Sequence, residues 1–312
     1  MILYRIVITH LQSQGVALIH PLQRSIIRAL LCVSLIGGFS AVAMSQAAGV
    51  PVQTRSVKSS DGVRIVYDVR GSGDTTLVFV HCWACNRFFW RDQVDAFSSR
   101  YRVVTLDLAG HGESGKDRKH WSTLGLASDV SAVADDLNLQ RVILVGHSMG
   151  GPVSLEAARL LRGRVIGVVL VDTMHDVDKR RSVASAQADA ERLRSNFTGY
   201  FSDLSSIFSK SADPAIRHWV EQQAQASDPA AAIALKLDTP NLDPKELFRQ
   251  AGVPIRAINS EPPFSDSTNI VEDRKYANYD VILVTNAGHF VQLERPEEFN
   301  RDLTRWVRDL SR

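Results

Sequence analysis

Short runs of valine, isoleucine and leucine recur along most of the chain, and the stretches between them have helical periodicity. Strands buried on both faces of a parallel sheet have continuous apolar sequences, and the connections between such strands are usually helices. The sequence therefore predicts an α/β fold with a mostly parallel central sheet and helices on both faces. The expected strands are residues 63–69, 76–80, 102–106, 141–145, 165–171, 255–258 and 281–284.

The turn at residues 146–150 reads Gly-His-Ser-Met-Gly and lies between an expected strand and an expected helix. A serine at the apex of such a turn has a sparsely allowed backbone conformation, and glycines are needed on both sides because a β-carbon there would clash with the strand and the helix. The pattern matches the Gly-x-Ser-x-Gly nucleophile elbow, which exposes the serine oxygen at the carboxyl-terminal edge of a sheet. Ser148 is thus the candidate nucleophile, and an ordinary glycine-rich turn is the alternative.

His289 is the candidate general base. A serine hydroxyl is a weak nucleophile unless a neighbouring base takes its proton and a third group orients that base. His289 follows the last expected strand and precedes an expected final helix at residues 296–310, so its loop can return to the sheet edge that holds Ser148. Three other histidines, His175 among them, have sequence surroundings typical of the surface.

Two backbone N–H groups are expected to form an oxyanion hole, in which both point at the negative charge that develops on the substrate. Met149 directly follows the candidate nucleophile, and Trp83 lies in the loop after the strand that ends at Val80. We assign the two N–H groups to Trp83 and Met149.

Three separated motifs are the loop that begins His-Cys-Trp at residue 81, the Asp-x-x-Gly-His-Gly-x-Ser turn at residues 107–114, and the Gly-x-Ser-x-Gly turn. Together they make residues 63–310 similar to the α/β-hydrolase superfamily, especially to its small bacterial carboxylesterases and related capped hydrolases. The resemblance implies an α/β-hydrolase fold in which serine, acid and histidine follow one another along the chain. Cys82 departs from the family pattern, which has a glycine at that position.

The position of the acid is open between two carboxylates. The resemblance places it in the loop after the seventh strand, but residues 258–263 have a proline where the acid is expected. Asp172 lies at the end of the sixth strand, and Glu261 lies two residues early in the seventh-strand loop. We favour Asp172 slightly because a strand end keeps the carboxylate at the same sheet edge, with Glu261 as the alternative and Asp266 third.

The strand pattern stops at residues 173–250, which are rich in Ala, Gln, Ser, Arg and Asp. An insertion after the sixth strand would form a helical cap over the strand ends, between core segments at residues 48–172 and 251–312. A helical excursion beside the sheet is the alternative. The helices expected in this insertion are residues 184–195, 214–226 and 229–237. Ordinary helix packing and an apolar pocket are both open for six cap residues, and packing is the commoner use of each: Phe197, Tyr200, Phe201, Ile207, Phe208 and Trp219.

Residues 1–47 are predicted to be a signal peptide. Arg24 and Arg28 precede an apolar run, and Ser-Gln-Ala at residues 45–47 places small residues at the two positions that a signal peptidase reads. We expect cleavage near Ala47, export to the periplasm or the medium, and no stable membrane span in the mature chain. An uncleaved membrane anchor is the alternative.

Cys82 and Cys85 form a Cys-x-x-Cys pair inside the expected oxyanion loop. One interpretation is that both are unpaired apolar side chains of the interior. The other is a disulfide that stiffens or switches the loop, which the oxidising compartment of an exported protein would permit.

The function expected from these residues is hydrolysis of a carboxylic ester or related acyl bond of a small molecule, through an acyl-enzyme and a Ser-His-acid triad. No metal or organic cofactor is expected, because the sequence has no glycine-rich phosphate loop, dinucleotide fingerprint or zinc-spaced Cys/His cluster. The net charge of +2 does not suggest a nucleic-acid partner. Hydrolysis of a carbon–carbon bond, a lactone or an amide, and ligand sensing with a slow triad, are the alternatives.

Overall fold

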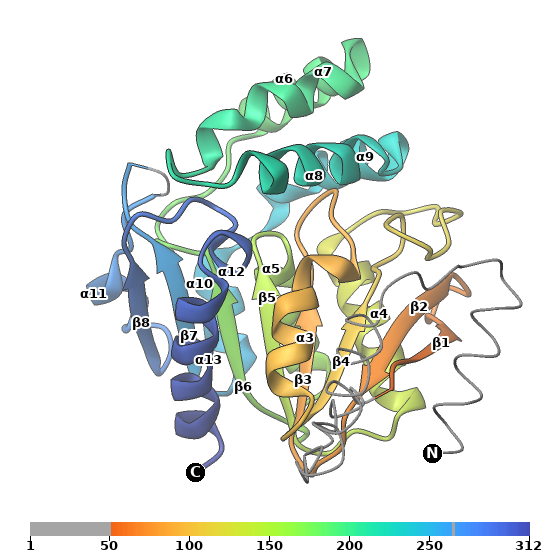
Figure 1. Cartoon of the computed structure of the whole chain (residues 1–312). Helices are drawn as coiled ribbons and strands as arrows, with labels where there is room; N and C mark the ends of the chain where they lie inside the picture. Colours follow the sequence, from red (N-terminus) through yellow and green to blue (C-terminus); the bar gives the residue numbers. More distant parts are fainter. Residues whose placement is uncertain (1–50, 264–265) are drawn as a thin grey trace, which may run out of the picture. The chain divides into compact units, whose positions relative to one another are not determined.

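An eight-stranded sheet forms the centre of the fold (Figure 1). The structure, a computed structural model, describes residues 51–263 and 266–312. The strands are β1 (Gln53–Lys58), β2 (Arg64–Arg70), β3 (Thr76–Val80), β4 (Arg102–Leu106), β5 (Val142–His147), β6 (Val165–Val171), β7 (Ile255–Ser260) and β8 (Tyr279–Val284). Their order is β1-β2-β4-β3-β5-β6-β7-β8, in which the β1–β2 and β2–β4 pairs are antiparallel and the other pairs are parallel. The predicted mostly parallel sheet is confirmed.

Each of the seven expected strands is present, with ends within two residues of the prediction. Strand β1 was not predicted. Five of its six residues are exposed, and its polar sequence pairs with β2 alone at the edge of the sheet. An edge strand that buries almost no side chain leaves little hydrophobic pattern to detect, because its stability comes from backbone hydrogen bonds to one neighbour.

Helices cover both faces of the sheet (Figure 1). The helices are η1 (Arg87–Trp90), α3 (Arg91–Phe97), α4 (Thr123–Asp136), α5 (Gly150–Leu160), α6 (Val183–Ser195), α7 (Phe197–Ser202), η2 (Asp203–Ile207), α8 (Pro214–Gln225), α9 (Pro229–Asp238), η3 (Thr239–Asn241), α10 (Pro244–Ala251), α11 (Ile270–Asp273), α12 (Val291–Glu294) and α13 (Pro296–Leu310). Residues of α3 and α13 belong to the apolar cluster on one face, and residues of α4, α5 and α10 belong to the cluster on the other. The final helix was predicted with the same bounds.

Strand β3 shows how the two apolar clusters share one sheet. Leu77 and Phe79 pack with Phe97 and Phe299 on one face, whereas Val78 and its alternate neighbour Val80 pack on the opposite face. Side chains alternate between the faces of a strand, so a sheet covered by helices on both sides requires an uninterrupted apolar run. All five residues of β3 are buried, as this arrangement demands.

The carboxyl ends of the parallel strands meet at one edge of the sheet. In the register, Val80 at the end of β3 pairs with Gly146 on β5, and His147 at the end of β5 pairs with Val171 on β6. The residues that follow these strands therefore start from neighbouring points. This edge collects the loops after β3, β5 and β6, where four of the candidate site residues were predicted: Trp83, Ser148, Met149 and Asp172.

Helices α6 to α9 lie over this edge of the sheet (Figure 1). The helical cap after the sixth strand is thus present, and the alternative of an excursion beside the sheet is wrong. Asp213 and Asp228 cap α8 and α9, and each is followed by a proline at the first helical position, which explains why the starts of these helices were predicted correctly. Leu247 and Phe248 of α10 pack in the core cluster. The cap boundaries at residues 173 and 250 stay predictions.

The predicted signal peptide at residues 1–47 lies outside the described residues. Within residues 51–263 and 266–312, every helix is too short or too polar to cross a membrane.

Candidate active site

Ser148 lies at the tip of the turn between β5 and α5, with a left-handed backbone at φ 51°. Its backbone N–H donates to the carbonyl of Val171 at 3.0 Å, which ties the turn to the end of β6. A β-carbon at Gly146 would clash with the carbonyl of Gly150, and a β-carbon at Gly150 would clash with the carbonyl of Val80. The turn therefore has the strained, close-packed geometry that the Gly-x-Ser-x-Gly pattern predicts.

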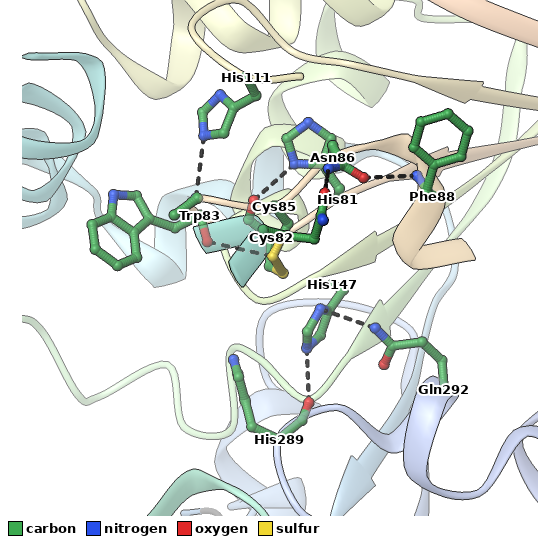
Figure 2. Close-up of a disulfide and its surroundings, with 12 residues drawn as sticks. His81, Cys82, Trp83, Cys85, Asn86, Phe88, His111, His147, His289 and Gln292 are labelled. Carbon is green, nitrogen blue, oxygen red and sulfur yellow. Dashed lines mark hydrogen bonds between the residues drawn. A yellow bond between two sulfur atoms is a disulfide. The ribbon is translucent and has the colours of Figure 1, made fainter. Parts of the chain in front are cut away.

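His289 contacts Asp172 across this edge of the sheet. In the loop between β8 and α12, its Nδ1 lies 2.6 Å from Oδ2 of Asp172. Its backbone is fixed on both sides: the N–H donates to the carbonyl of Ile207 at 2.7 Å, and the carbonyl accepts from Nε2 of His147 at 2.8 Å (Figure 2). Because Nδ1 faces the carboxylate, Nε2 is the ring nitrogen that remains for proton exchange with a substrate or a nucleophile.

The carboxylate of Asp172 is buried and well supplied with hydrogen-bond donors. Its Oδ1 accepts from the backbone N–H of Ser260 at 2.9 Å and from the hydroxyl of Ser260 at 2.7 Å, and Nε2 of His175 lies 3.3 Å away. Burial alone would raise the pKa of Asp172, but the hydrogen bonds and charges of His175 and His289 hold that pKa far below its usual value. Asp172 is therefore ionised at neutral pH, so Nδ1 of His289 is the proton donor in their hydrogen bond.

The other two candidate acids lie elsewhere. The backbone N–H of Glu261 donates to the carbonyl of Val284, and no hydrogen bond or ion pair joins its carboxylate to His289 in the described part of the chain. The Asp266 side chain is 70% exposed and lies 4.0 Å from the ammonium of Lys179. The structure thus brings Asp172, and not Glu261, against His289.

His175 is not a surface residue, contrary to expectation. Its side chain is only 12% exposed and contacts Asp172, three residues earlier in the chain. Positive φ angles at Asp172 and Met174, 45° and 52°, make the sharp turn that folds His175 back onto the carboxylate. The sequence signal that could have predicted this contact is the spacing of His175, three residues after an aspartate at the end of a strand.

The backbone N–H groups of Trp83 and Met149 both lack a protein acceptor within the described residues. The neighbouring amides are occupied: Ala84 donates to Nε2 of His111 at 3.3 Å, and Cys85 donates to the carbonyl of Cys82 at 3.2 Å. One of the two unoccupied donors, Met149, directly follows the candidate nucleophile in sequence, and Trp83 lines the same cavity as Ser148. This is the supply of N–H groups that an oxyanion hole needs.

Cys82 and Cys85 form a disulfide that closes the oxyanion loop (Figure 2). Of the two interpretations of the Cys-x-x-Cys pair, the disulfide is the one that the structure contains. Both cysteines are almost completely buried and line the same cavity as Ser148. The bridge spans Trp83, whose N–H is one of the two unoccupied donors.

Two buried histidines, His81 and His111, join this loop to the neighbouring turn. His81 accepts from the Leu108 N–H through Nε2, so its Nδ1 must donate to the carbonyl of Cys82. His111 likewise accepts from Ala84 through Nε2 and donates through Nδ1 to its own turn. Burial lowers the pKa of His81 to about 4, and burial together with His81 lowers the pKa of His111 to about 3, so both are neutral at pH 7.

The loop of the candidate base is joined to the cap and to α12 by further hydrogen bonds that sequence reasoning missed. One carboxylate oxygen of Glu294 accepts from the N–H groups of Gly288 and Ser209, at 3.1 and 3.0 Å. Nδ1 of His147 accepts from Gln292 at 3.2 Å, and burial lowers the pKa of His147 to about 3, so this ring is a neutral brace. Glu294, Gln292 and His147 have no distinctive sequence pattern, and most of their hydrogen-bond partners are far away in the chain. The sequence therefore contains no signal for these contacts.

A cavity of about 590 Å³ lies between the cap and the sheet edge. Ser148, Asp172, His289 and Trp83 line its core side. The predicted cap residues that line it are Tyr200, Phe201, Ile207 and Phe208. Phe197 packs against Phe201 within the cap, and Trp219 packs against Phe89 of the core helix η1, so neither of these two lines the cavity. No group of three or more His, Cys, Asp or Glu side chains in the described part of the chain is arranged to hold a metal ion.

A model of the alpha/beta hydrolase family matches residues 77–302, well over half of the sequence. The chain belongs to the alpha/beta hydrolase family. The hydrolase is 28% identical over 262 residues to the dihydrolipoyllysine-residue acetyltransferase component of the acetoin cleaving system of Pseudomonas putida, a match that covers 80% of this chain and 69% of that protein.

The chain is also similar to a protein named as an enol-lactonase and to a solved structure of an esterase. The hydrolase is 26% identical over 243 residues to 3-oxoadipate enol-lactonase 1 of Acinetobacter baylyi, covering 75% of this chain and 89% of the relative. A thermophilic esterase from Thermogutta terrifontis has a similar structure, with a TM-score of 0.74 and 22% identity, covering 83% of this chain and 99% of that chain. The structural likeness confirms the predicted α/β-hydrolase fold.

Proposed function

We propose that the hydrolase cleaves carboxylic esters, lactones or related acyl bonds of small molecules through an acyl-enzyme on Ser148. The observation that carries the proposal is the 2.6 Å hydrogen bond between His289 and Asp172, at a cavity that Ser148 also lines. An ionised buried acid, an oriented imidazole and a serine on a strained turn are the three groups that activated-serine chemistry requires.

In the proposed reaction, Ser148 Oγ attacks the carbonyl carbon while Nε2 of His289 accepts the hydroxyl proton. Asp172 stabilises the imidazolium that forms. The N–H groups of Trp83 and Met149 donate to the negative oxygen of the tetrahedral intermediate. His289 then delivers its proton to the leaving oxygen as the bond to the acyl carbon breaks. In the second half of the reaction a water molecule attacks the acyl-enzyme while His289 accepts a proton from it. His289 returns that proton to Ser148 Oγ as the acyl–Oγ bond breaks, which releases the carboxylic acid and restores the serine.

The names of two similar proteins support this substrate class. One is an enol-lactonase and the other an esterase, and both names describe cleavage of a bond between an acyl carbon and oxygen. Lactones therefore belong in the proposed range beside open-chain esters.

The first test is hydrolysis of p-nitrophenyl esters of increasing acyl length by the wild type and by Ser148→Ala, together with labelling by a fluorophosphonate. We expect turnover and labelling by the wild type, and a loss of at least about 10⁴-fold in kcat for Ser148→Ala, because the nucleophile is removed. A wild type that neither labels nor exceeds Ser148→Ala on any ester or lactone would contradict the proposal. Slow labelling with ligand binding but no turnover would favour the sensor alternative.

A further inference from the structure

Lys236 reaches the active-site cavity from the cap. It lies on α9, and its ammonium is 4.0 Å from the centre of the Trp83 ring in the oxyanion loop. The Trp83 indole N–H donates to the carbonyl of Ala232 one turn earlier on α9, at 2.9 Å, so ring and helix are fixed against each other. Lys236 lines the same cavity as Ser148 and His289.

The ammonium of Lys236 has no anionic partner in the described part of the chain. Arg181 also lines the cavity, but it forms an ion pair with Asp189, so that acid is already occupied. Arg192 lies 3.9 Å from the same carboxylate. Burial first, and the charge of Arg181 second, lower the pKa of Lys236 to about 8. At neutral pH the lysine is still mainly protonated, so a positive charge lies at the cavity beside the Trp83 ring, with no carboxylate within ion-pair distance in the described part of the chain.

The remaining charged side chains of the cavity make no ion pair with Lys236 in the described part of the chain. Glu221 accepts from Ser202 at 2.6 Å and from Gln225 at 3.0 Å. Arg217 donates to the carbonyl of Ser209 at 2.5 Å. Asp266 is mostly exposed and lies beside a lysine of its own. None of these groups neutralises Lys236, and burying an unpaired charge is unfavourable unless a bound ligand supplies the opposite charge.

We propose that Lys236 binds a carboxylate of the substrate, so that the preferred substrates are esters or lactones that carry a free acid group on their acyl part. This proposal rests on the proposed function, because it names the substrate class of that same site. The cation stands beside Trp83, so a carboxylate bound there lies close to the oxyanion loop without competing for its N–H groups.

Binding to catalytically inactive protein tests the inference independently of turnover. The probes are mono-p-nitrophenyl glutarate and the same ester with its free acid capped as a methyl ester, titrated into Ser148→Ala protein by tryptophan fluorescence. We expect the free acid to bind about tenfold or more tightly than the capped ester, because a charge-assisted hydrogen bond is lost on capping. Equal dissociation constants for the two probes would overturn the inference and need no further variant to interpret.

Second-site variants then assign the effect to Lys236. In Ser148→Ala protein, Lys236→Met should abolish the preference for the free acid, and Lys236→Arg should keep most of it. Lys58→Met is the matched control, because Lys58 is exposed on the edge strand β1 and should leave the preference intact. A preference that survives Lys236→Met would place the anion site elsewhere.

Turnover separates the two proposals. If the wild type does not hydrolyse either ester but Ser148→Ala binds the acid selectively, the proposed function fails and the anion site stands. If the wild type hydrolyses the capped ester at least as well as the free acid, the proposed function stands and the anion site fails.

Discussion

Asp172 has a backbone conformation that few non-glycine residues adopt, with φ at 45°. Its N–H donates to the carbonyl of Ile258, as in a regular parallel strand. The chain then leaves the sheet, and the carboxylate accepts hydrogen bonds from the N–H and the hydroxyl of Ser260. Strain of this kind typically costs about 1–3 kcal/mol, and here it is offset by two hydrogen bonds from Ser260 and by contacts with two histidines. The result is an acid with one oxygen held and the other facing His289.

We expect Asp172→Asn to lower kcat by about 10³–10⁴-fold, because an amide neither fixes the imidazole tautomer nor stabilises the imidazolium. The matched control is Glu261→Gln, the same chemical change in the neighbouring loop, which should keep kcat within about threefold. Ester hydrolysis at saturating substrate measures both. A collapse of Glu261→Gln with an active Asp172→Asn would assign the acid to the seventh-strand loop instead.

The sequence could name single candidates for the nucleophile and the base, Ser148 and His289, but it left a choice between carboxylates for the acid. The serine has a local signature, and the histidine has a fixed place between the last strand and the last helix. The acid depends on which of two strand ends turns its carboxylate toward His289, and that is decided by backbone angles at Asp172 and contacts with Ser260. Such angles are not readable from residue types, since aspartate at a strand end is also common as a turn or capping residue.

At the scale of elements, long apolar strands and proline-started helices were predicted well because each has a local cause. The exposed strand β1 was missed because its pairing is made by the backbone. The loop between β3 and η1 has some features that the sequence shows locally and others that depend on distant contacts. Its cysteines are visible in the sequence, whereas the histidines that hold it, His81 and His111, are neutral only because the fold buries them. Export, which would expose the cysteines to an oxidising compartment, stays a prediction.

Reduction of the disulfide should lower kcat by about tenfold. The bridge constrains the turn that presents the Trp83 N–H, and loosening a donor should have a smaller effect than the 10²–10³-fold typical of removing one. Turnover would be followed with and without reductant, alongside a count of free thiols. The double variant Cys82→Ser, Cys85→Ser should match the reduced protein and be insensitive to reductant. Identical kcat values for oxidised and reduced protein would show that the bridge has no catalytic role.

At the scale of the whole molecule, the core and the cap contribute different residues to the candidate site. The loops after β5, β6 and β8 supply Ser148, Asp172 and His289, while the cap supplies most of the apolar wall and Lys236. The sheet edge therefore positions Ser148 and Asp172, whereas the loop of His289 is also hydrogen-bonded to the cap. The stability of the molecule also depends on buried groups away from the cavity.

Asp273 makes the free energy of unfolding depend on pH. It is fully buried on α11, its Oδ1 accepts from the Val177 N–H at 3.0 Å, and its Oδ2 has no partner within the described residues. Burial raises the pKa of Asp273 to about 7, above its value of 3.8 in an unfolded chain. The folded state thus holds a proton that the unfolded state loses, so the contribution of Asp273 to stability should fall by roughly 2 kcal/mol as pH rises from 5 to 7. The buried neutral histidines His81, His111 and His147 act in the opposite direction, because their pKa values are lowered on folding.

Urea unfolding at several pH values measures this effect. The difference in unfolding free energy between wild type and Asp273→Asn should change by roughly 2 kcal/mol between pH 5 and 7, because the amide cannot ionise. The matched control Asp280→Asn changes an exposed-edge carboxylate paired with Arg274 and should keep the wild-type slope. If wild type and Asp273→Asn have the same slope over this range, Asp273 does not titrate as argued.

Hydrogen bonds join the cap to the loop that carries His289. The carbonyl of Ile207 accepts from the His289 N–H, and one oxygen of Glu294 bridges Gly288 and Ser209. Exchange of caps between family members is an obvious route to new substrate ranges. In this protein a cap taken from another family member would have to reproduce the backbone path of residues 207–209. Without that path, the hydrogen bonds that hold the loop of His289 would be lost and the imidazole would be displaced.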